Sequence, residues 1–141
     1  MRRSLSRAAH HNKRPPAARR GARVRLVPGG CEEDPLNSRP IKEAISFSEE
    51  KLKKNALFDS QRLFYDLYCL LPGQHQKVHA HEGSDKVYYV LEGTGRFTVG
   101  DEEQDLPGGH AVIARAGEPH GVRNASGENL VLLVTMAPRP S

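Results

Sequence analysis

Three histidines are the residues of this chain whose types and spacing are best suited to chemistry. His79 and His81 stand two positions apart, and His120 follows an Ala-Gly-Glu-Pro turn about forty residues later. On a strand, the first two imidazoles would project from one face, with their backbones roughly 7 Å apart. Three converging imidazoles suit Fe, Mn, Ni, Cu or Zn and leave coordination positions open for substrate or dioxygen. The spacing therefore predicts a divalent transition-metal site on His79, His81 and His120.

The histidines lie within two longer motifs. The first reads G-x5-H-x-H-x4-K-x6-G and the second reads G-x5-R-x-G-x2-H-x3-N. Their outer residues are Gly73 and Gly93 in the first motif, and Gly109 and Asn124 in the second. This pattern resembles the cupin superfamily, and over about residues 55–137 the chain is similar to its small single-domain, conserved-barrel members. The resemblance implies an antiparallel double-stranded β-helix, or RmlC-like jelly-roll barrel, with the histidines inside it.

Two positions depart from the family pattern. Arg115 stands where cupins usually have Pro, and Lys86 stands where typical members have the Glu that supplies a fourth metal ligand. A charged lysine about 5 Å from a divalent ion would repel that ion by roughly 6 to 7 kcal/mol at an effective dielectric constant near 20. A metal site in this barrel therefore requires that the ammonium of Lys86 be moved away or neutralised.

Three arrangements would satisfy this requirement. In the first, which we favour, the flexible side chain of Lys86 carries its ammonium to the mouth of the barrel. In the second, which we place next, a bulge at Gly83 and Ser84 turns Asp85 inward as a metal ligand, because Asp85 is also correctly spaced from His81. In the third, burial and a nearby cation lower the pKa of Lys86 until its amine is neutral.

Other side chains are expected around the pocket. Lys86 and Tyr88 alternate along a predicted strand, so we expect both to line the pocket and to bind substrate, with core packing as the other interpretation of Tyr88. His75 precedes His79 by four residues, roughly 13 Å along a strand, and is expected on the same face at the rim.

Two functions fit these residues. The first is a metal-dependent enzyme acting on a small organic substrate, in which the ion polarises an oxygen or activates dioxygen and Lys86 or Tyr88 moves a proton or orients the substrate. The resemblance implies dioxygenase-like or isomerase-like chemistry. The alternative is a non-catalytic barrel that binds a small anion or sugar without metal. Nucleophile-and-base motifs and phosphate-binding loops are absent from the sequence, which argues against hydrolase and P-loop chemistry.

The elements that must position these residues are short strands. Runs rich in Val, Tyr, Phe and Leu alternate with turn residues at even spacing, which predicts an all-β antiparallel barrel. The predicted strands span 56–58, 62–71, 76–81, 86–93, 95–100, 110–114, 120–124 and 129–138. A Ser followed by two acids and later by lysines predicts one short helix over 48–54. The apolar last strand is expected at a sheet edge that a second copy covers in a homodimer.

The N-terminal segment differs from the rest in charge. The first thirty positions hold nine of the 21 Lys and Arg residues and none of the 17 Asp and Glu residues, so the remainder is acidic. We expect residues 1–38 to be a disordered basic tail and residues 39–141 to be the barrel domain. A transit peptide, or upstream sequence without a role, would also fit this tail.

The same composition bears on partners and location. The positive charge comes without aromatic residues on which bases would stack, so we expect no nucleic acid as partner. No apolar run is long enough to span a membrane. We therefore expect a cytoplasmic protein whose partner is a small-molecule ligand or substrate.

Overall fold

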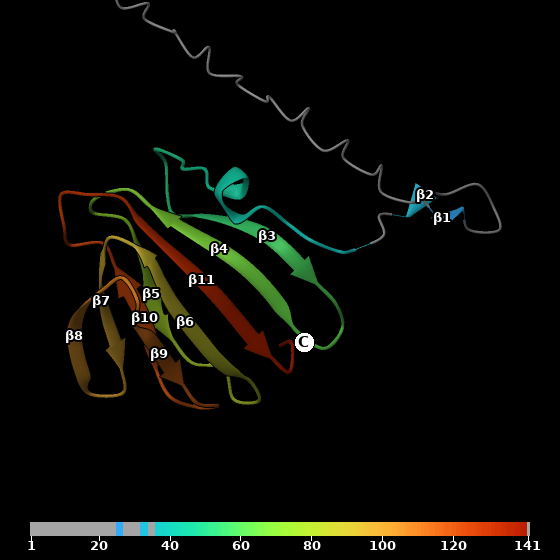
Figure 1. Cartoon of the computed structure of the whole chain (residues 1–141). Coiled ribbons are helices and arrows are strands. Elements are labelled where there is room, and N and C mark those ends of the chain that lie inside the picture. Colours follow the sequence, from blue (N-terminus) through green and yellow to red (C-terminus); the bar gives the residue numbers. More distant parts are fainter. Residues whose placement is uncertain (1–24, 27–31, 34–35, 141) are drawn as a thin grey trace, which may run out of the picture. The chain divides into compact units, whose positions relative to one another are not determined.

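The computed structural model describes residues 25–26, 32–33 and 36–140 (Figure 1). Backbone contacts divide the chain into two units, Met1–Ser38 and Arg39–Ser141. In the first unit, strand β1 (Arg25–Leu26) pairs with strand β2 (Glu32–Glu33). Residues 36–38 form no helix or strand and are exposed, and the remainder of the predicted disordered tail lies outside the described residues.

Two antiparallel sheets make up the second unit (Figure 1). The five-stranded sheet has the order β3-β4-β11-β6-β9, and the four-stranded sheet has the order β5-β10-β7-β8. The first contains β3 (Lys53–Asp59), β4 (Phe64–Leu70), β6 (Asp85–Glu92), β9 (Ala111–Ala114) and β11 (Leu130–Ala137). The second contains β5 (His75–His79), β7 (Thr94–Val99), β8 (Glu102–Pro107) and β10 (His120–Arg123). The prediction of an all-β antiparallel barrel is confirmed.

The core lies between the two sheets because apolar residues alternate along the strands. On β6, Tyr88 and Val90 are buried, whereas Val87 and Tyr89, which alternate with them, are exposed. Residues from both sheets form one buried cluster, to which Phe97 contributes from the four-stranded sheet. The period-2 alternation thus fixes which side chains of each strand enter the barrel.

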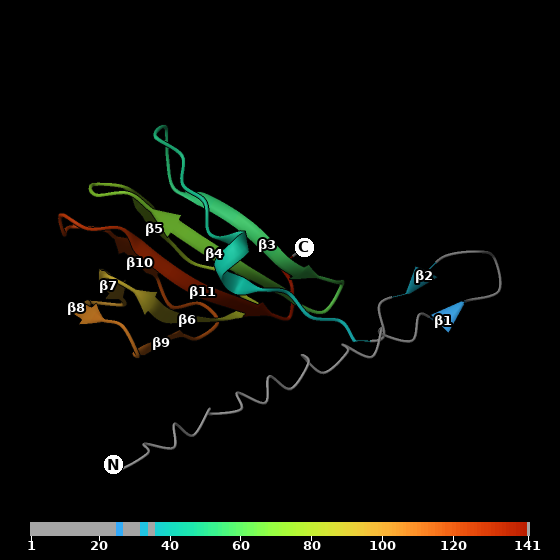
Figure 2. The same cartoon turned by 45° about the horizontal axis from the view of Figure 1, so that its top comes forward.

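A second apolar cluster covers the outer face of β3, β4 and β11. Leu67 and Val131 are fully buried there beneath Ile41 and Phe47 from the segment that precedes β3. That segment contains the 3₁₀ helix η1 (Ile41–Ala44), and Figure 2 shows its turn beside β3 and β4. The N-terminal part of this unit therefore seals one side of the sheet against water.

The predicted helix over 48–54 is wrong. Ser48 instead accepts a hydrogen bond from the backbone N–H of Glu50 at 3.3 Å, and Lys53 and Lys54 already belong to β3. Pairing of β3 with β4 overrides the local helix signal, as tertiary context commonly does. Within residues 36–140 the structure contains no helix long and apolar enough to cross a bilayer. The cytoplasmic location stays a prediction.

The position of β11 corrects the reasoning behind the predicted homodimer. This apolar strand is not at an edge, because it pairs with β4 on one side and with β6 on the other. Its backbone groups are therefore satisfied within the sheet, and its composition reflects burial on both faces. The homodimer stays a prediction.

Candidate metal centre

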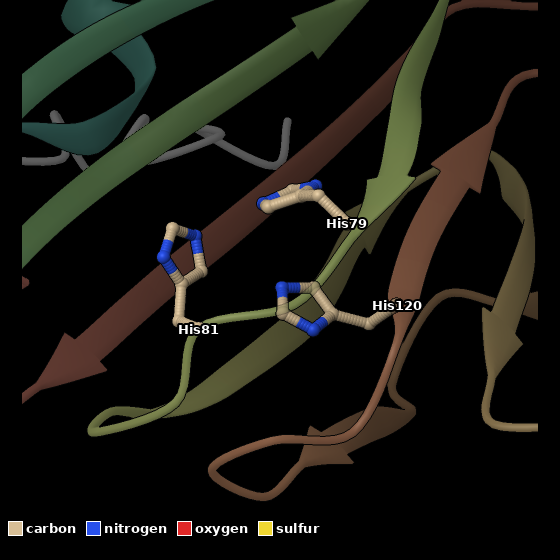
Figure 3. Close-up of side chains that lie close together, drawn as sticks. All are labelled: His79, His81 and His120. Carbon is tan, nitrogen blue, oxygen red and sulfur yellow. The ribbon is translucent and has the colours of Figure 1, made fainter.

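Three histidine rings meet at one end of the barrel. His79 is the last residue of β5 and lies directly opposite His120, the first residue of β10, while His81 stands two residues beyond the end of β5. Figure 3 shows the three side chains pointing toward one another. Ring centroids are 4.8 Å apart for His79 and His81, 4.6 Å for His79 and His120, and 5.8 Å for His81 and His120. One ligand atom from each residue lies within 4.8 Å of the others.

His81 reaches the cluster from a loop and not from the strand on which it was expected. Its carbonyl oxygen accepts a hydrogen bond of 2.8 Å from the N–H of Gly117, in the turn that leads into His120. Gly117 has φ +83°, a conformation that favours glycine. The loop of one histidine is therefore tied to the turn that presents another.

Asp85 contributes to this connection and not to the cluster. The Asp85 side chain is exposed, and its Oδ1 accepts a hydrogen bond of 2.9 Å from the N–H of Ala116. The structure therefore does not bring Asp85 in beside the histidines, as the predicted bulge required. It acts on the site by holding the turn before His120.

Backbone carbonyls fix the tautomers of two of the histidines. Nδ1 of His79 lies 2.7 Å from the carbonyl oxygen of Lys77, and Nδ1 of His120 lies 2.9 Å from the carbonyl oxygen of Glu118. A carbonyl oxygen can only accept, so each Nδ1 carries the proton and each Nε2 presents a lone pair. Metal-binding histidines commonly have such an arrangement, in which the second ring nitrogen donates to an oxygen.

The lone pair on Nε2 of His120 is buried without a hydrogen-bond partner. Nε2 of His120 is buried, and it is the only such side-chain nitrogen or oxygen within residues 36–140 that makes no hydrogen bond. Burying an unsatisfied polar atom is costly, so this nitrogen indicates a group that the protein is built to receive. Three imidazole nitrogens in this arrangement fit an ion of the Fe, Mn, Ni, Cu or Zn class, and they do not suit Mg²⁺ or Ca²⁺.

The surroundings of His81 and His120 favour the neutral form of these two rings. Burial, followed by the nearby His79, Lys86 and Lys54, lowers the pKa of His81. Burial also lowers the pKa of His120, despite the opposing effect of the hydrogen bond to Glu118. Because a neutral imidazole is the form that binds metal, both shifts extend the pH range in which these rings can serve as ligands.

Lys86 points into the barrel and is only 1% exposed. Its Nζ lies 5.2 and 5.0 Å from the ring centroids of Tyr68 and Tyr88, and it donates to Oε1 of Gln76 at 3.3 Å. The favoured prediction, in which the ammonium reaches the barrel mouth, is therefore wrong. Burial, and then the charge of Lys54, lowers the pKa of Lys86 to about 7, so the arrangement with a neutral amine fits the structure.

Tyr88 lies deeper than predicted. Its side chain is fully buried, its hydroxyl donates to Oε1 of Gln76 at 2.8 Å, and its ring packs near Phe97 and His120 with centroids 5.5 and 6.3 Å away. Lys86, by contrast, lines a cavity of about 340 Å³ together with His79 and His81. Tyr88 therefore supports the wall of this cavity from behind Gln76.

Gln76 is a cavity residue that the sequence did not reveal. Gln76 pairs with Val122 and His79 pairs with His120, so β5 has two residues between these positions where β10 has only Gly121. This bulge breaks the alternation, and Gln76 and His79 consequently face the same side. His75, which was predicted on the face of His79, is exposed and pairs with Arg123.

Comparison with known proteins identifies the class. The sequence pattern of the family described as Cupin domain matches residues 66–136, about half of the chain. The protein therefore belongs to the cupin family, and the resemblance seen in the two histidine motifs is confirmed.

Individual relatives support this assignment. The crystal structure of TT1209 from Thermus thermophilus is 53% identical, with a TM-score of 0.73, and covers 74% of this chain and 100% of that one. An RmlC-like cupin protein from Desulfovibrio desulfuricans is 30% identical, with a TM-score of 0.65, and covers 73% of this chain and 97% of that one. The oxalate-binding protein of Thermotoga maritima is 31% identical over 85 residues, 60% of this chain and 69% of that protein.

Proposed function

We propose that this cupin holds one divalent transition-metal ion on His79, His81 and His120 and uses the site to bind a small organic acid. The observation that carries the proposal is the buried, unpartnered Nε2 of His120, which faces two further imidazoles. When bound, the ion would supply Lewis acidity to an oxygen of the ligand. A carboxylate ligand from the protein is not needed, since three imidazoles are sufficient donors for such ions.

The charge around the histidines supports an anionic ligand. Three neutral imidazoles leave both charges of the ion uncompensated, because Asp85 lies outside the cluster. Lys86 and Lys54 line the same cavity. A carboxylate is the ligand class that such a positive environment attracts, and a neutral sugar would gain nothing from it. The similarity to an oxalate-binding protein is consistent with this class.

Catalysis is the second candidate function, and the observation that favours it is the position of Lys86. The amine lies in the cavity with a pKa of about 7, where a group can both accept and donate a proton at neutral pH. Tyr88 is less suited to this role, because burial raises the pKa of its hydroxyl and this hydroxyl already donates its hydrogen bond to Gln76.

Metal content is the first test. The full chain is purified without chelator and analysed by plasma mass spectrometry beside His79→Ala and His120→Ala. We expect near one equivalent of Fe, Mn, Ni, Cu or Zn in the wild type and little in either variant. His110→Ala is the matched control, because His110 is exposed and bonded to the carbonyl of Pro107 outside the cluster. Equal, substoichiometric metal in all four proteins would refute the metal site.

Ligand binding is the second test. Oxalate is titrated into the wild type by calorimetry, before and after removal of the metal with a chelator. We expect chelation to abolish binding, because the ion is part of the ligand site. Binding that survives chelation would favour the metal-free anion-binding module. Turnover of oxalate or of 2-oxo acids, followed by NMR and lost in Lys86→Gln, would establish the catalytic candidate.

A further inference from the structure

The cavity beside the histidines has further polar side chains in its lining. It is lined by His79 and His81 and also by Tyr68, Gln76 and the lysines Lys54, Lys77 and Lys86. Nζ of Lys54 lies 5.0 Å from the ring centroid of Tyr68, and Nζ of Lys86 lies 5.2 Å from the same centroid. Two amines from strands β3 and β6 thus lie near the same aromatic ring and line the same cavity, and the charge of Lys54 acts on Lys86.

Neither amine forms an ion pair with an acid in the part of the chain that the structure describes. The ion pairs among the described residues join Arg96 to Glu103 and Asp105, and Arg139 to Asp59. The charge of Asp66 acts on both Lys54 and Lys86, but Asp66 forms no ion pair with either of them. Neighbouring cations that lack an anion are unfavourable in a partly buried site, and a bound anion would remove this cost.

Contacts hold Lys86 in place for such a role. Gln76 accepts from both its Nζ and the hydroxyl of Tyr88, and the rings of Tyr68 and Tyr88 flank the side chain. A long lysine that would be mobile at a surface is therefore fixed before any ligand arrives, which reduces the entropy lost on binding. Lys54, on an exposed position of β3, supplies the second and more adaptable charge.

We propose that Lys86 and Lys54 form an anion subsite in the cavity that His79 and His81 also line, so that the protein selects small molecules with two acidic groups. One carboxylate lies at the histidines, and the other lies beside the two lysines, where its negative charge favours the ammonium form of Lys86 and it accepts charge-assisted hydrogen bonds from both side chains. The inference rests on the proposed function, since the histidines must hold the first acid. A lysine at the position of the family's glutamate then acts as a specificity-determining residue for dicarboxylates.

The test compares diacids with monoacids of equal chain length. Malonate, succinate and glutarate are titrated by calorimetry into the metal-loaded full chain, beside propionate, butyrate and valerate. We expect the wild type to bind at least one diacid about tenfold or more tightly than its matching monoacid. Lys86→Met should weaken that diacid about ten- to hundredfold and leave the monoacid within about twofold, as expected for the loss of one charged hydrogen-bond donor.

Further variants keep the test independent of any folding defect. Lys54→Met should reduce the diacid preference in the same direction, and Lys86→Arg, which keeps the cation, should retain most of it. Lys53→Met is the matched control, because Lys53 is the exposed neighbour of Lys54 and is not among the residues that line the cavity. A wild type without diacid preference, or Lys86→Met and Lys54→Met variants that retain it, would overturn the subsite.

Metal content separates this failure from failure of the proposed function. Each sample is analysed by plasma mass spectrometry before titration. Wild-type protein without bound metal would overturn the proposed function at the histidines, and the inference with it. Full metal in wild type and in Lys86→Met, together with an unchanged diacid preference, would overturn only the lysine subsite.

Discussion

Replacing Lys86 with Met should make the metal-free protein more stable at neutral pH. The amine is 1% exposed and titrates with a pKa of about 7, compared with 10.5 for an ordinary lysine, chiefly because of burial and then because of Lys54. Asp66 opposes the shift without reversing it. Folding therefore removes a proton that the unfolded chain would hold, and this costs free energy.

The magnitude follows from the two pKa values. At about 1.4 kcal/mol per pKa unit, the cost to folding is about 4 kcal/mol at pH 7 and about 2 kcal/mol at pH 9. Between these pKa values the unfolded state binds more protons than the folded state, so stability rises with pH across the window. Met also loses the hydrogen bond to Gln76, worth about 1 kcal/mol, while Gln76 keeps its bond to Tyr88. The net gain is about 3 kcal/mol at pH 7 and about 1 kcal/mol at pH 9.

Urea denaturation of chelator-treated wild type and Lys86→Met at both pH values measures this difference. Titration of all other groups cancels in the comparison, because both proteins share them. Lys53→Met, which changes an exposed lysine on the same sheet, should differ little from wild type at either pH. A Lys86→Met protein that is less stable at pH 7, or a difference that does not shrink at pH 9, would refute the reasoning.

Three other outcomes are expected. Burial lowers the pKa of His81 and His120 from 6.5, so both rings stay neutral at lower pH and Zn²⁺ should remain bound during dialysis to a pH below 6.5. Loss of Zn²⁺ already at neutral pH, measured by plasma mass spectrometry, would contradict this. Gly93→Ala should lower the free energy of unfolding by about 2 to 5 kcal/mol, because Gly93 has φ +83° and a Cβ would overlap a backbone carbonyl oxygen. Gly127→Ala is the control and should cost far less in the same urea titration, because Gly127 has open space around it. Asn124→Ala should cost about 2 to 4 kcal/mol, because the buried amide donates to two backbone carbonyls; an unchanged urea midpoint would argue against that role.

The sequence was informative wherever structure depends on local pattern. Alternation of apolar residues located β6 and β11 to within a residue or two, and the turn before His120 was visible as Ala-Gly-Glu-Pro. The three histidines could be grouped because their motif spacing follows from strand and turn lengths. These features require no knowledge of what packs against what.

Other features depend on partners distant in sequence. Strand β8 (Glu102–Pro107) was missed because its residues are mostly exposed and polar, and it exists through pairing with β7, where Arg96 binds Asp105 at 2.8 Å. The bulge that brings Gln76 inward arises where β5 meets β10. The residue pattern within β8 or within β5 does not predict these arrangements.

The burial of Lys86 also depends on residues from other strands and therefore could not be predicted from the sequence. A lysine beside an open barrel end has the length to reach water, and whether it does so depends on what closes around it. Here Tyr68 from β4 and Gln76 from β5 supply an aromatic face and an acceptor, and both strands are separate from β6 in the sequence. The contacts that hold the amine are therefore properties of the assembled barrel.

The central position of β11 also constrains how the protein is made. Without β11, the five-stranded sheet consists of two separate pairs, β3 with β4 and β6 with β9. During synthesis β11 cannot join the two pairs until it has left the ribosome, so the sheet that holds Tyr68 and Lys86 is completed only then. Such late, long-range strand pairing slows folding and leaves apolar strand edges open meanwhile. A nascent chain stalled before β11 would be a substrate for chaperones and proteases.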